Sequence, residues 1–434
     1  MLVYPAMRSG LACVVLCVAA CLPAVPQLPS AGGPRWVEIK SEHFRLWTDD
    51  SLERGRRLVR DLERRREVIA SAMGAPPSPA TALVMSVRNA RERAVYVPIE
   101  FIGAAWGPHN PTGQAGILIA ADHNDPRDHV VSHELAHVVS LGWFANLPPW
   151  LSEGIATYFE MVDVDSDETS VTIGTLAPGR AATLRGRLIP TVADLFACLD
   201  QRCKDAAFYA GSWAMFTLLL NEHYDGLARY LQRLNQLPRD AEDTRWEGEA
   251  SELPPDQQAR ARARWIEQSN RDRSAAWHDA FPDLPLEKLD AELTEWLRTG
   301  KLRLPRVDIT VREFPTEVRM LGDADVLAAR SWLGYWFTSD KTTALRDAEA
   351  ALALDRSNVL AQIVATALTH AISPEAARRT AAAHPDDWRA LRLVARAVHG
   401  TDEAIRALRR LCSIAGGAAP ECRPPRPPRT LEDR

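Results

Sequence analysis

The sequence predicts an α+β fold with a small N-terminal β-sheet lobe, a helical second lobe and an α-helical repeat-like domain after them. Three observations lead to this order. Short apolar or alternating runs are confined to the first 120 residues, and helical periodicity dominates beyond them. The length of 434 residues exceeds what a single compact core needs. Near the C-terminus, a helical pattern recurs after 30 residues.

The sheet lobe is predicted from the first part of the chain. The stretch Trp36–Trp47 alternates apolar and polar residues with one interruption near Ser41, which indicates paired strands or one bulged strand. From Ser51 to Met73 the spacing becomes helical, and Gly74 offers a C-terminal stop. Two short apolar runs are candidate core strands: Ala82–Val87 and Gly116–Ala120.

A well-marked helix is predicted next, from Pro126 to Leu141. Asp125 can cap it, and a proline is well suited to the first turn. Gly142 offers a C-terminal stop, and Pro148–Pro149 prevents the helix from continuing. A second helix is therefore expected to begin near Trp150.

Helices dominate the second lobe. Phe208–Leu220 and the amphipathic stretch Gly226–Leu234 are predicted to be buried helices. The charged segment Arg239–Arg264 contains a Pro-Pro break, which indicates a surface excursion or a mobile insert. Separate helices carrying Trp265 and Trp277 are expected after it.

The C-terminal part is rich in alanine and leucine. After a boundary at residues 302–313, the segment Ala351–Asn358 has an analogue in Ala381–Trp388, which suggests stacked helical hairpins. This domain, residues 313–412, resembles degenerate tetratricopeptide repeats, and a plain helical bundle is the alternative. The resemblance implies a surface for a protein partner. The Pro/Arg-rich tail, residues 413–434, is predicted to be disordered.

The N-terminus has the pattern of an export signal. A positive residue, Arg8, precedes an apolar run that is too short to span a bilayer. The following Val18-Ala19-Ala20-Cys21 resembles a bacterial lipobox, which implies cleavage after residue 20, a lipid on Cys21 and attachment to the outer membrane. An ordinary cleaved signal peptide is the alternative. Either reading predicts export to the cell envelope or periplasm, with residues 21–34 as a linker.

The cysteine content agrees with export, and the net charge argues against one class of partner. The net charge of -5 provides no long basic surface, so a nucleic-acid partner is not expected. Without the signal and Cys21, four cysteines are left, and this even number suits an oxidising compartment. We expect the two local pairs among the three connectivities that four cysteines allow, Cys198 with Cys203 and Cys412 with Cys422.

The strongest chemical signal is His133-Glu134-Leu135-Ala136-His137. Histidines four positions apart on a helix are separated by about 40° around its axis, so both imidazoles can bind one metal ion. Glu134 points to one side of them, where it can act on water as a general base. On its own the motif also fits an amphipathic helix whose histidines only contact the core.

Sixteen residues after His137, Glu153 stands in Trp150-Leu-Ser-Glu-Gly-Ile-Ala-Thr-Tyr158. The two segments together resemble the gluzincin zinc peptidases, in particular the bacterial peptidase MA-like family. The resemblance covers roughly residues 35–302 and implies a zincin-like domain there. It further implies Zn²⁺ held by His133, His137 and Glu153, with Glu134 as the catalytic base.

Three further residues are candidates near this site. Glu160 lies seven positions after Glu153 and can replace it as a ligand or support the ligands from outside. His129 lies one turn before His133, where a role in supporting the ligands or a structural role is favoured over ligation. The same resemblance places Tyr209 of the Tyr209-Ala-Gly-Ser212 motif as a catalytic residue that stabilises an oxyanion, and a packing tyrosine is the alternative.

These features predict a zinc metallopeptidase of the bacterial cell envelope that hydrolyses peptide or protein substrates, with water activated by zinc and by Glu134. One alternative is a non-catalytic envelope scaffold or binding lipoprotein with a structural or vestigial zinc site. Another is hydrolysis of a non-peptide substrate with the same ion and base. The sequence does not identify the substrate.

Overall fold

The computed structural model has a mixed α+β fold, mostly helical, with a small mixed sheet near the N-terminus. This confirms the α+β prediction at that level. The structure describes residues 26–74, 81–88, 103–106, 115–120, 129–144, 146–162, 169–185, 189–199, 204–237, 255–300, 302–310, 312–338, 340–415 and 422.

The main sheet has six strands in the order β4-β5-β3-β2-β1-β8. β2, β3 and β5 run parallel, while β1, β4 and β8 each pair antiparallel with a neighbour. The strands of this sheet are β1 (Trp36–Lys40), β2 (Phe44–Thr48), β3 (Ala82–Val87), β4 (Gly103–Trp106), β5 (Gly116–Ala120) and β8 (Glu317–Leu321).

The predicted paired strands and the helix after them are confirmed. β1 and β2 form an antiparallel hairpin, and Ser41 lies in its turn. Helix α2 (Leu52–Met73) begins after Ser51, whose side chain accepts a hydrogen bond from the Arg54 N–H. It ends at Gly74, which has φ +60°, a left-handed conformation that glycine adopts without steric cost. α2 thus makes the crossover between the parallel strands β2 and β3.

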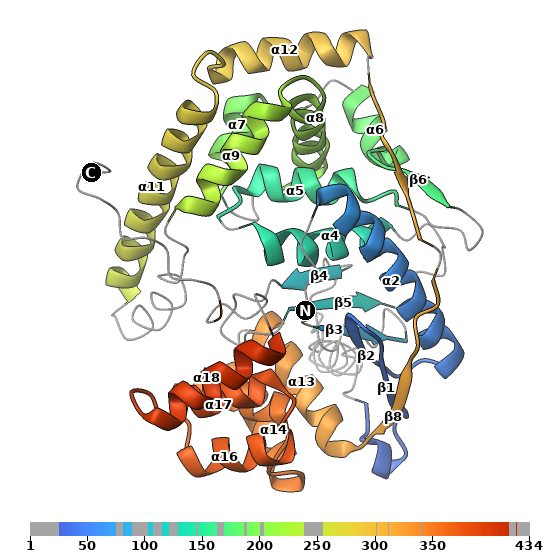
Figure 1. Cartoon of the computed structure of the whole chain (residues 1–434), viewed down its shortest axis with the longest axis vertical. Coiled ribbons are helices and arrows are strands. Elements are labelled where there is room, and N and C mark those ends of the chain that lie inside the picture. Colours follow the sequence, from blue (N-terminus) through green and yellow to red (C-terminus); the bar gives the residue numbers. More distant parts are fainter. Residues whose placement is uncertain are drawn as a thin grey trace, which may run out of the picture.

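The two faces of the sheet pack against different helices, because alternate residues of a strand point in opposite directions. Ile39, Leu46 and Val84 belong to a large core that contains residues of α2 and α4. Trp47 and Met85 belong to a second core with residues of α13 and α15. Figure 1 shows the sheet between α2 and α4 on one side and the C-terminal helices on the other.

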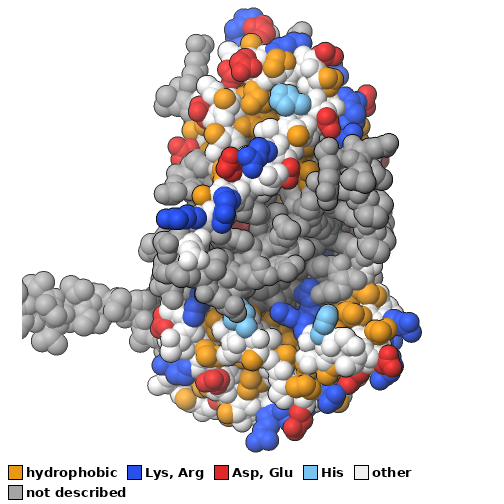
Figure 2. Space-filling view, turned by 90° about the vertical axis from the view of Figure 1, so that its left-hand side faces the viewer, with side chains coloured by type: hydrophobic (Ala, Val, Ile, Leu, Met, Phe, Trp, Pro, Cys, Tyr) orange, Lys and Arg blue, Asp and Glu red, His pale blue; other side chains and the backbone are white. Residues whose placement is uncertain are grey.

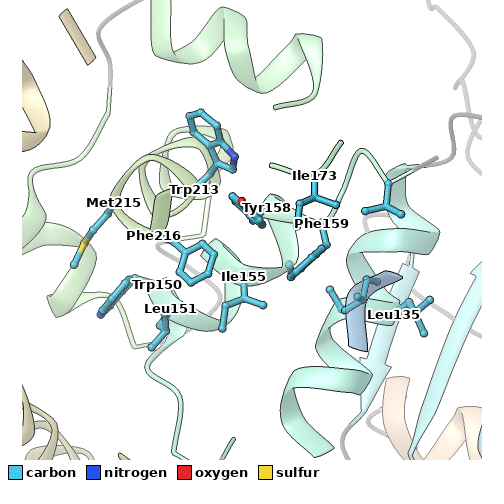
Figure 3. Packing of buried hydrophobic residues seen from close by; sticks show 14 of the residues in the cluster. Leu135, Trp150, Leu151, Ile155, Tyr158, Phe159, Ile173, Trp213, Met215 and Phe216 are labelled. Carbon is cyan, nitrogen blue, oxygen red and sulfur yellow. The ribbon is translucent and has the colours of Figure 1, made fainter. Parts of the chain in front are cut away.

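Helices α4 and α5 follow β5, and several helices surround them. The second lobe comprises α4 (His129–Trp143), α5 (Pro149–Tyr158), α6 (Pro178–Arg185), α7 (Val192–Ala197), α8 (Ala206–Glu222), α9 (Tyr224–Gln236), α11 (Pro255–Ala280) and α12 (Leu286–Thr299). In Figure 3, side chains of α5 such as Ile155 lie between Leu135 of α4 and Phe216 of α8. α5 is therefore the central helix of the large core.

A close approach of α5 and α8 depends on Gly154. A Cβ atom at this position would lie 2.7 Å from the Ser212 carbonyl oxygen, which is part of the backbone of α8. The glycine next to Glu153 therefore lets the two helices pack at short range. Ser212 of the Tyr-x-x-Ser motif is fully buried at this contact.

Two predictions about helix limits were wrong. Trp265 and Trp277 lie on one helix, α11, which begins at Pro255, so residues 255–264 belong to a helix and not to an insert. Proline is compatible with a first helical position because its missing N–H is not needed there. Residues 239–254 lie outside the described residues.

The C-terminal domain consists of successive helices α13 (Asp323–Phe337), α14 (Lys341–Leu354), α15 (Val359–Thr369), α16 (Pro374–Ala383), α17 (Trp388–Ala397) and α18 (Asp402–Ala415). Each repeated segment spans the end of one helix and the turn into the next: Asn358 caps α15, and Asp387 caps α17. The predicted helical hairpins are therefore present. The tetratricopeptide likeness stays a prediction.

The C-terminal domain is joined to the sheet lobe more closely than a boundary at residues 302–313 suggested. Strand β7 (Arg306–Asp308) pairs with β6 (Ser170–Thr172) in a second small sheet. β8 then completes the main sheet beside β1. Figure 1 shows the extended segment that runs from α12 down to β8.

Both ends of the described chain contact helices. In the predicted linker, residues Pro29–Ala31 form the short 3₁₀ helix η1, and the Ser30 N–H donates to Asp323 at the start of α13 (3.1 Å). Helix α18 extends to Ala415, into the predicted tail. The Cys412–Cys422 disulfide is confirmed. Cys198 is also disulfide-bonded, and Cys203 lies outside the described residues.

The described surface is mixed in charge. On the face in Figure 2, acidic and basic side chains are interspersed over the upper helical lobe and the C-terminal domain below it. Among the helices that the structure describes, none combines the length and the apolar character that a membrane span requires. Residues 1–25, which include the predicted signal and Cys21, lie outside the described part.

Candidate metal centre

Helix α4 carries the two histidines of the motif. Its described part runs from His129 to Trp143, so the predicted start at Asp125–Pro126 lies outside the described residues. The predicted stop at Gly142 was wrong, because the helix passes through it. The left-handed residue of the turn is Asn146, with φ 57°, whose side chain donates to the Leu234 carbonyl (3.0 Å). This bond ties the turn between α4 and α5 to α9.

Helix α5 brings Glu153 to the histidines. Pro148 precedes the helix and Pro149 is its first residue, so the chain reverses and α5 packs on α4. The Oε2 atom of Glu153 lies 3.2 Å from the Nε2 atom of His133 and 3.2 Å from that of His137. One ligand atom of each residue lies within 4.8 Å of the others. Among the described residues, this is the group of His, Cys, Asp and Glu that can hold a metal ion.

The donor set and its spacing fit zinc. Two imidazole nitrogens and one carboxylate oxygen are donors that zinc prefers, and three protein ligands leave a fourth position open. Ligand atoms around a tetrahedral ion with bonds of about 2.0–2.1 Å are about 3.3 Å apart. The 3.2 Å separations between Glu153 and the two histidines agree with that value.

Two residues that were not predicted from the sequence, Lys204 and Ser152, form hydrogen bonds with the candidate ligands. Lys204 Nζ donates to Oε1 of Glu153 (2.8 Å), so Oε2 is the oxygen that faces the imidazoles. Ser152 Oγ lies 3.2 Å from Nδ1 of His137. With Nδ1 as the donor, this bond leaves Nε2 as the metal-binding nitrogen. Both contacts orient ligand atoms toward the centre of the site.

The three ionisable groups influence one another strongly. Burial by itself raises the pKa of Glu153, but the facing His137 and His133 imidazoles hold it well below its usual range. Burial opposes charge on His137, and the carboxylates of Glu153 and Glu134 nevertheless raise the pKa of its imidazole. Glu153 is therefore held as a carboxylate, the form that binds a metal ion, whereas a proton on His137 would compete with a metal ion for its Nε2 atom.

Glu134 lies beside the ligand set, at the edge of the main sheet. Burial raises the pKa of its carboxyl group, and the neighbouring His133 and His137 only partly oppose this. A carboxylate with a raised pKa is a better proton acceptor near neutral pH. Gly103 of β4 lies against it: a Cβ atom there would be 3.0 Å from Cγ of Glu134 and 2.5 Å from Val130. The glycine lets β4 approach the candidate base.

Of the three other candidates from the sequence, Tyr209 lies near the ligands, and Glu160 and His129 are outside the ligand group. The ring centroid of Tyr209, on α8, lies 5.9 Å from that of His133. Glu160 is buried and accepts two hydrogen bonds from Arg180, at 2.7 and 2.9 Å. His129 begins the described part of α4 and is not part of the ligand group.

Lys204 and Arg180 carry no signal in the sequence alone. Arg180 stands among small residues and Lys204 in a short polar segment, and neither stands at a fixed spacing from the histidine motif. Ser152 could have been found, because it precedes Glu153 directly and a metal-binding histidine usually needs a hydrogen-bond partner for its second ring nitrogen.

A family model described as "Protein of unknown function (DUF1570)" matches residues 128–240. The matched segment includes α4, α5 and α8, and so all three candidate ligands, Glu134 and Tyr209. The search of curated proteins found no match. The comparisons therefore outline a segment around the site and assign no activity to it.

Proposed function

We propose that this protein is a zinc-dependent metallopeptidase of the gluzincin type, with a zincin-like domain, that acts in the bacterial cell envelope. The observation that carries the proposal is the position of one carboxylate oxygen of Glu153 at 3.2 Å from the Nε2 atoms of both His133 and His137. Lys204 binds the other oxygen, Oε1, so Oε2 faces two imidazole nitrogens at a spacing that suits three ligands of one zinc ion. The lipid anchor at Cys21 and a partner on the helical repeats belong to the same proposal.

Each residue of the site has a role in this reaction. His133, His137 and Glu153 hold zinc, and Lys204 and Ser152 orient two of these ligands. Zinc at this place supplies a Lewis acid that polarises a carbonyl group and lowers the pKa of water. Glu134 accepts the proton of the attacking water and returns it to the leaving amine. Tyr209 donates a hydrogen bond to the developing oxyanion.

A peptide substrate is supported by the strand that borders Glu134. β4 pairs with β5 on one side, and no strand among the described residues pairs with its other edge. An extended peptide can bind such an edge through backbone hydrogen bonds. Because Gly103 brings β4 into contact with Glu134, a peptide bound there would pass beside the base. This position favours a peptide over a small non-peptide ester.

Metal analysis tests the ligand set first. We expect the purified protein to bind one equivalent of zinc, and His137→Ala and Glu153→Ala to lose it, because each removes one of three ligands. Glu160→Gln is the matched control, since Glu160 is a buried glutamate two residues after the end of α5 and pairs with Arg180. Zinc retained in Glu153→Ala and lost in Glu160→Gln would move the third ligand to Glu160.

Hydrolysis is tested with Glu134→Gln, which keeps the size of the side chain and removes its basicity. We expect this variant to bind zinc with unchanged stoichiometry and to lose activity by about 10²–10⁴-fold, the usual contribution of a general base. The assay follows fluorescein-labelled casein. Full activity in this variant would exclude the mechanism. A folded, zinc-loaded parent that cleaves neither casein nor a peptide library would favour the scaffold alternative.

A further inference from the structure

Arg180 lies close to the metal centre without contacting a ligand. It is the third residue of α6, and its guanidinium binds Glu160 through Nε (2.7 Å) and one terminal nitrogen (2.9 Å). The side chain of Arg180 is 21% exposed and that of Glu160 is 7% exposed. A two-bond pair of this kind fixes the plane of the guanidinium as well as its position.

Glu160 connects Arg180 to the helix that carries Glu153. It lies two residues after the end of α5, and its carboxylate is buried. The pair therefore places a fixed cation next to the ligand helix. Because the two charges compensate each other, Arg180 is poorly suited to bind a substrate carboxylate. Its role therefore has to come from its second contact.

The second contact of Arg180 is with the ring of Tyr209. The guanidinium carbon of Arg180 lies 4.5 Å from the centroid of the Tyr209 ring, a cation–π arrangement. The same ring lies 5.9 Å from the His133 ring. Glu160, Arg180, Tyr209 and His133 therefore form one continuous series of contacts from the end of α5 through α6 and α8 to α4.

We propose that Arg180, fixed by Glu160, positions the ring of Tyr209 at the metal centre so that its hydroxyl group reaches the oxyanion. Arg180 is a positioning residue and touches neither metal nor substrate. This inference rests on the proposed peptidase function, in which Tyr209 is the oxyanion donor. In this inference, Glu160 holds the guanidinium of Arg180 in place and is not a zinc ligand.

A double-mutant cycle tests the inference in the full-length, zinc-loaded chain with fluorescein-labelled casein. Tyr209→Phe is expected to lower kcat by about 10²-fold, as loss of an oxyanion donor does. Arg180→Met should lower kcat by up to the same factor and leave KM within about twofold, and the double variant should be no slower than Tyr209→Phe alone. Arg180→Lys should restore little, because lysine cannot make the two-bond pair. Losses that multiply in the double variant, or a change in KM alone, would overturn the proposal.

A structural measurement keeps the proposal testable if casein is not a substrate. In a crystal structure of Arg180→Met, the Tyr209 ring should move away from its 5.9 Å separation from His133. Glu160→Gln should produce the same displacement and serves as a second variant if Arg180→Met does not fold. A ring that stays in place in both variants would refute the proposal, whatever the activity of the parent.

The matched control is Arg378→Met. Arg378 makes an equivalent two-bond pair with Glu403 (2.8 and 2.7 Å), but this pair lies on α16 and α18 of the C-terminal domain. Its loss should leave kcat, zinc content and the Tyr209 ring unchanged. An inactive parent with a displaced ring in Arg180→Met would reject the peptidase function and keep the positioning role, so the two failures are distinguishable.

Discussion

The two faces of the main sheet contact cores of different composition. The core shared with α13 and α15 is built from apolar side chains such as Trp332, Leu327 and Met85. The core shared with α2, α4 and α5 is larger, and buried ionisable groups lie among its helices, including Glu63, His133 and Glu153. Buried charges cost stability unless they have partners, and the face toward the C-terminal helices also holds such groups, since Glu38 and Arg389 are buried there and each has an oppositely charged partner. The face with α4 and α5 differs in that three of its residues bring their donor atoms together so that they can hold one metal ion.

The face of the sheet that packs against α2, α4 and α5, called the metal face below, tolerates its buried charges because they have partners. Each buried ionisable group there has an identified partner: Glu63 accepts hydrogen bonds from Ser41 and the His43 backbone, and Glu160 accepts from Arg180. Apolar residues on the opposite sides of α4 and α5, including Leu135 and Ile155, supply the packing that fixes these helices. Stability and chemistry therefore depend on different sides of the same helices.

The largest expected effect is on the apolar face. Trp332→Ala should lower the free energy of unfolding by about 3–5 kcal/mol, because the side chain is fully buried and packs edge-on against Trp106. Zinc stoichiometry at temperatures where the variant is folded should not change. Urea denaturation and metal analysis measure the two quantities separately.

The control is Leu354→Ala in the same domain. Leu354 is 61% exposed, so its loss should change the free energy of unfolding by no more than about 0.5 kcal/mol. If folded Trp332→Ala lost its zinc, the two faces would be coupled and the separation of roles between them would be wrong.

The next prediction concerns Gly103 on β4, the edge strand of the main sheet. Gly103→Ala should lower activity on casein by about tenfold, because the added Cβ would meet Val130 at 2.5 Å and Glu134 at 3.0 Å, and such overpacking costs about 1–3 kcal/mol. Zinc binding should be retained, since the substitution touches no ligand. The measurement is kcat/KM beside zinc content.

Gly142→Ala is the matched glycine control. It lies on the same helix as Glu134, but a Cβ there meets no atom within 4 Å. Because alanine is the better helix former, this variant should be as active as the parent and slightly more stable, by about 0.5–1 kcal/mol. Full activity in Gly103→Ala would show that the position of β4 does not matter for the base.

Much of the sheet lobe and of the ligand set could be predicted, because both depend on local patterns. Alternation defines β1 and β2, a helical period with a cap and a left-handed glycine defines α2, and spacing on one helix aligns His133 with His137. These features need only the few residues around them. The choice of Glu153 over Glu160 rested on the resemblance, and the structure brings Glu153 to the two histidines.

What could not be predicted depends on contacts between distant segments. β8 pairs with β1 although nearly 280 residues separate them, and nothing in Glu317–Leu321 specifies that partner. Arg180 gains its importance only from lying between Glu160 and Tyr209 in space. The length of α11 was missed because Pro255 looks like a helix breaker although it stands at a first turn.

The last prediction concerns how zinc binding at His137 depends on pH. Glu153 and Glu134 raise the pKa of the His137 imidazole above about 6.5 despite its burial. In protein stripped of metal, charged His137 therefore contributes stability that is complete below about pH 6.5 and is lost as pH rises through the raised pKa. Zinc binds only the neutral imidazole. Below the pKa of His137, the apparent Kd for zinc should therefore rise by up to about tenfold for each pH unit. Chelator competition between pH 5.5 and 8 measures this slope. His223→Gln, which removes a similar His–Glu pair outside the site, should leave the slope unchanged, whereas a Kd independent of pH would exclude His137 as a ligand.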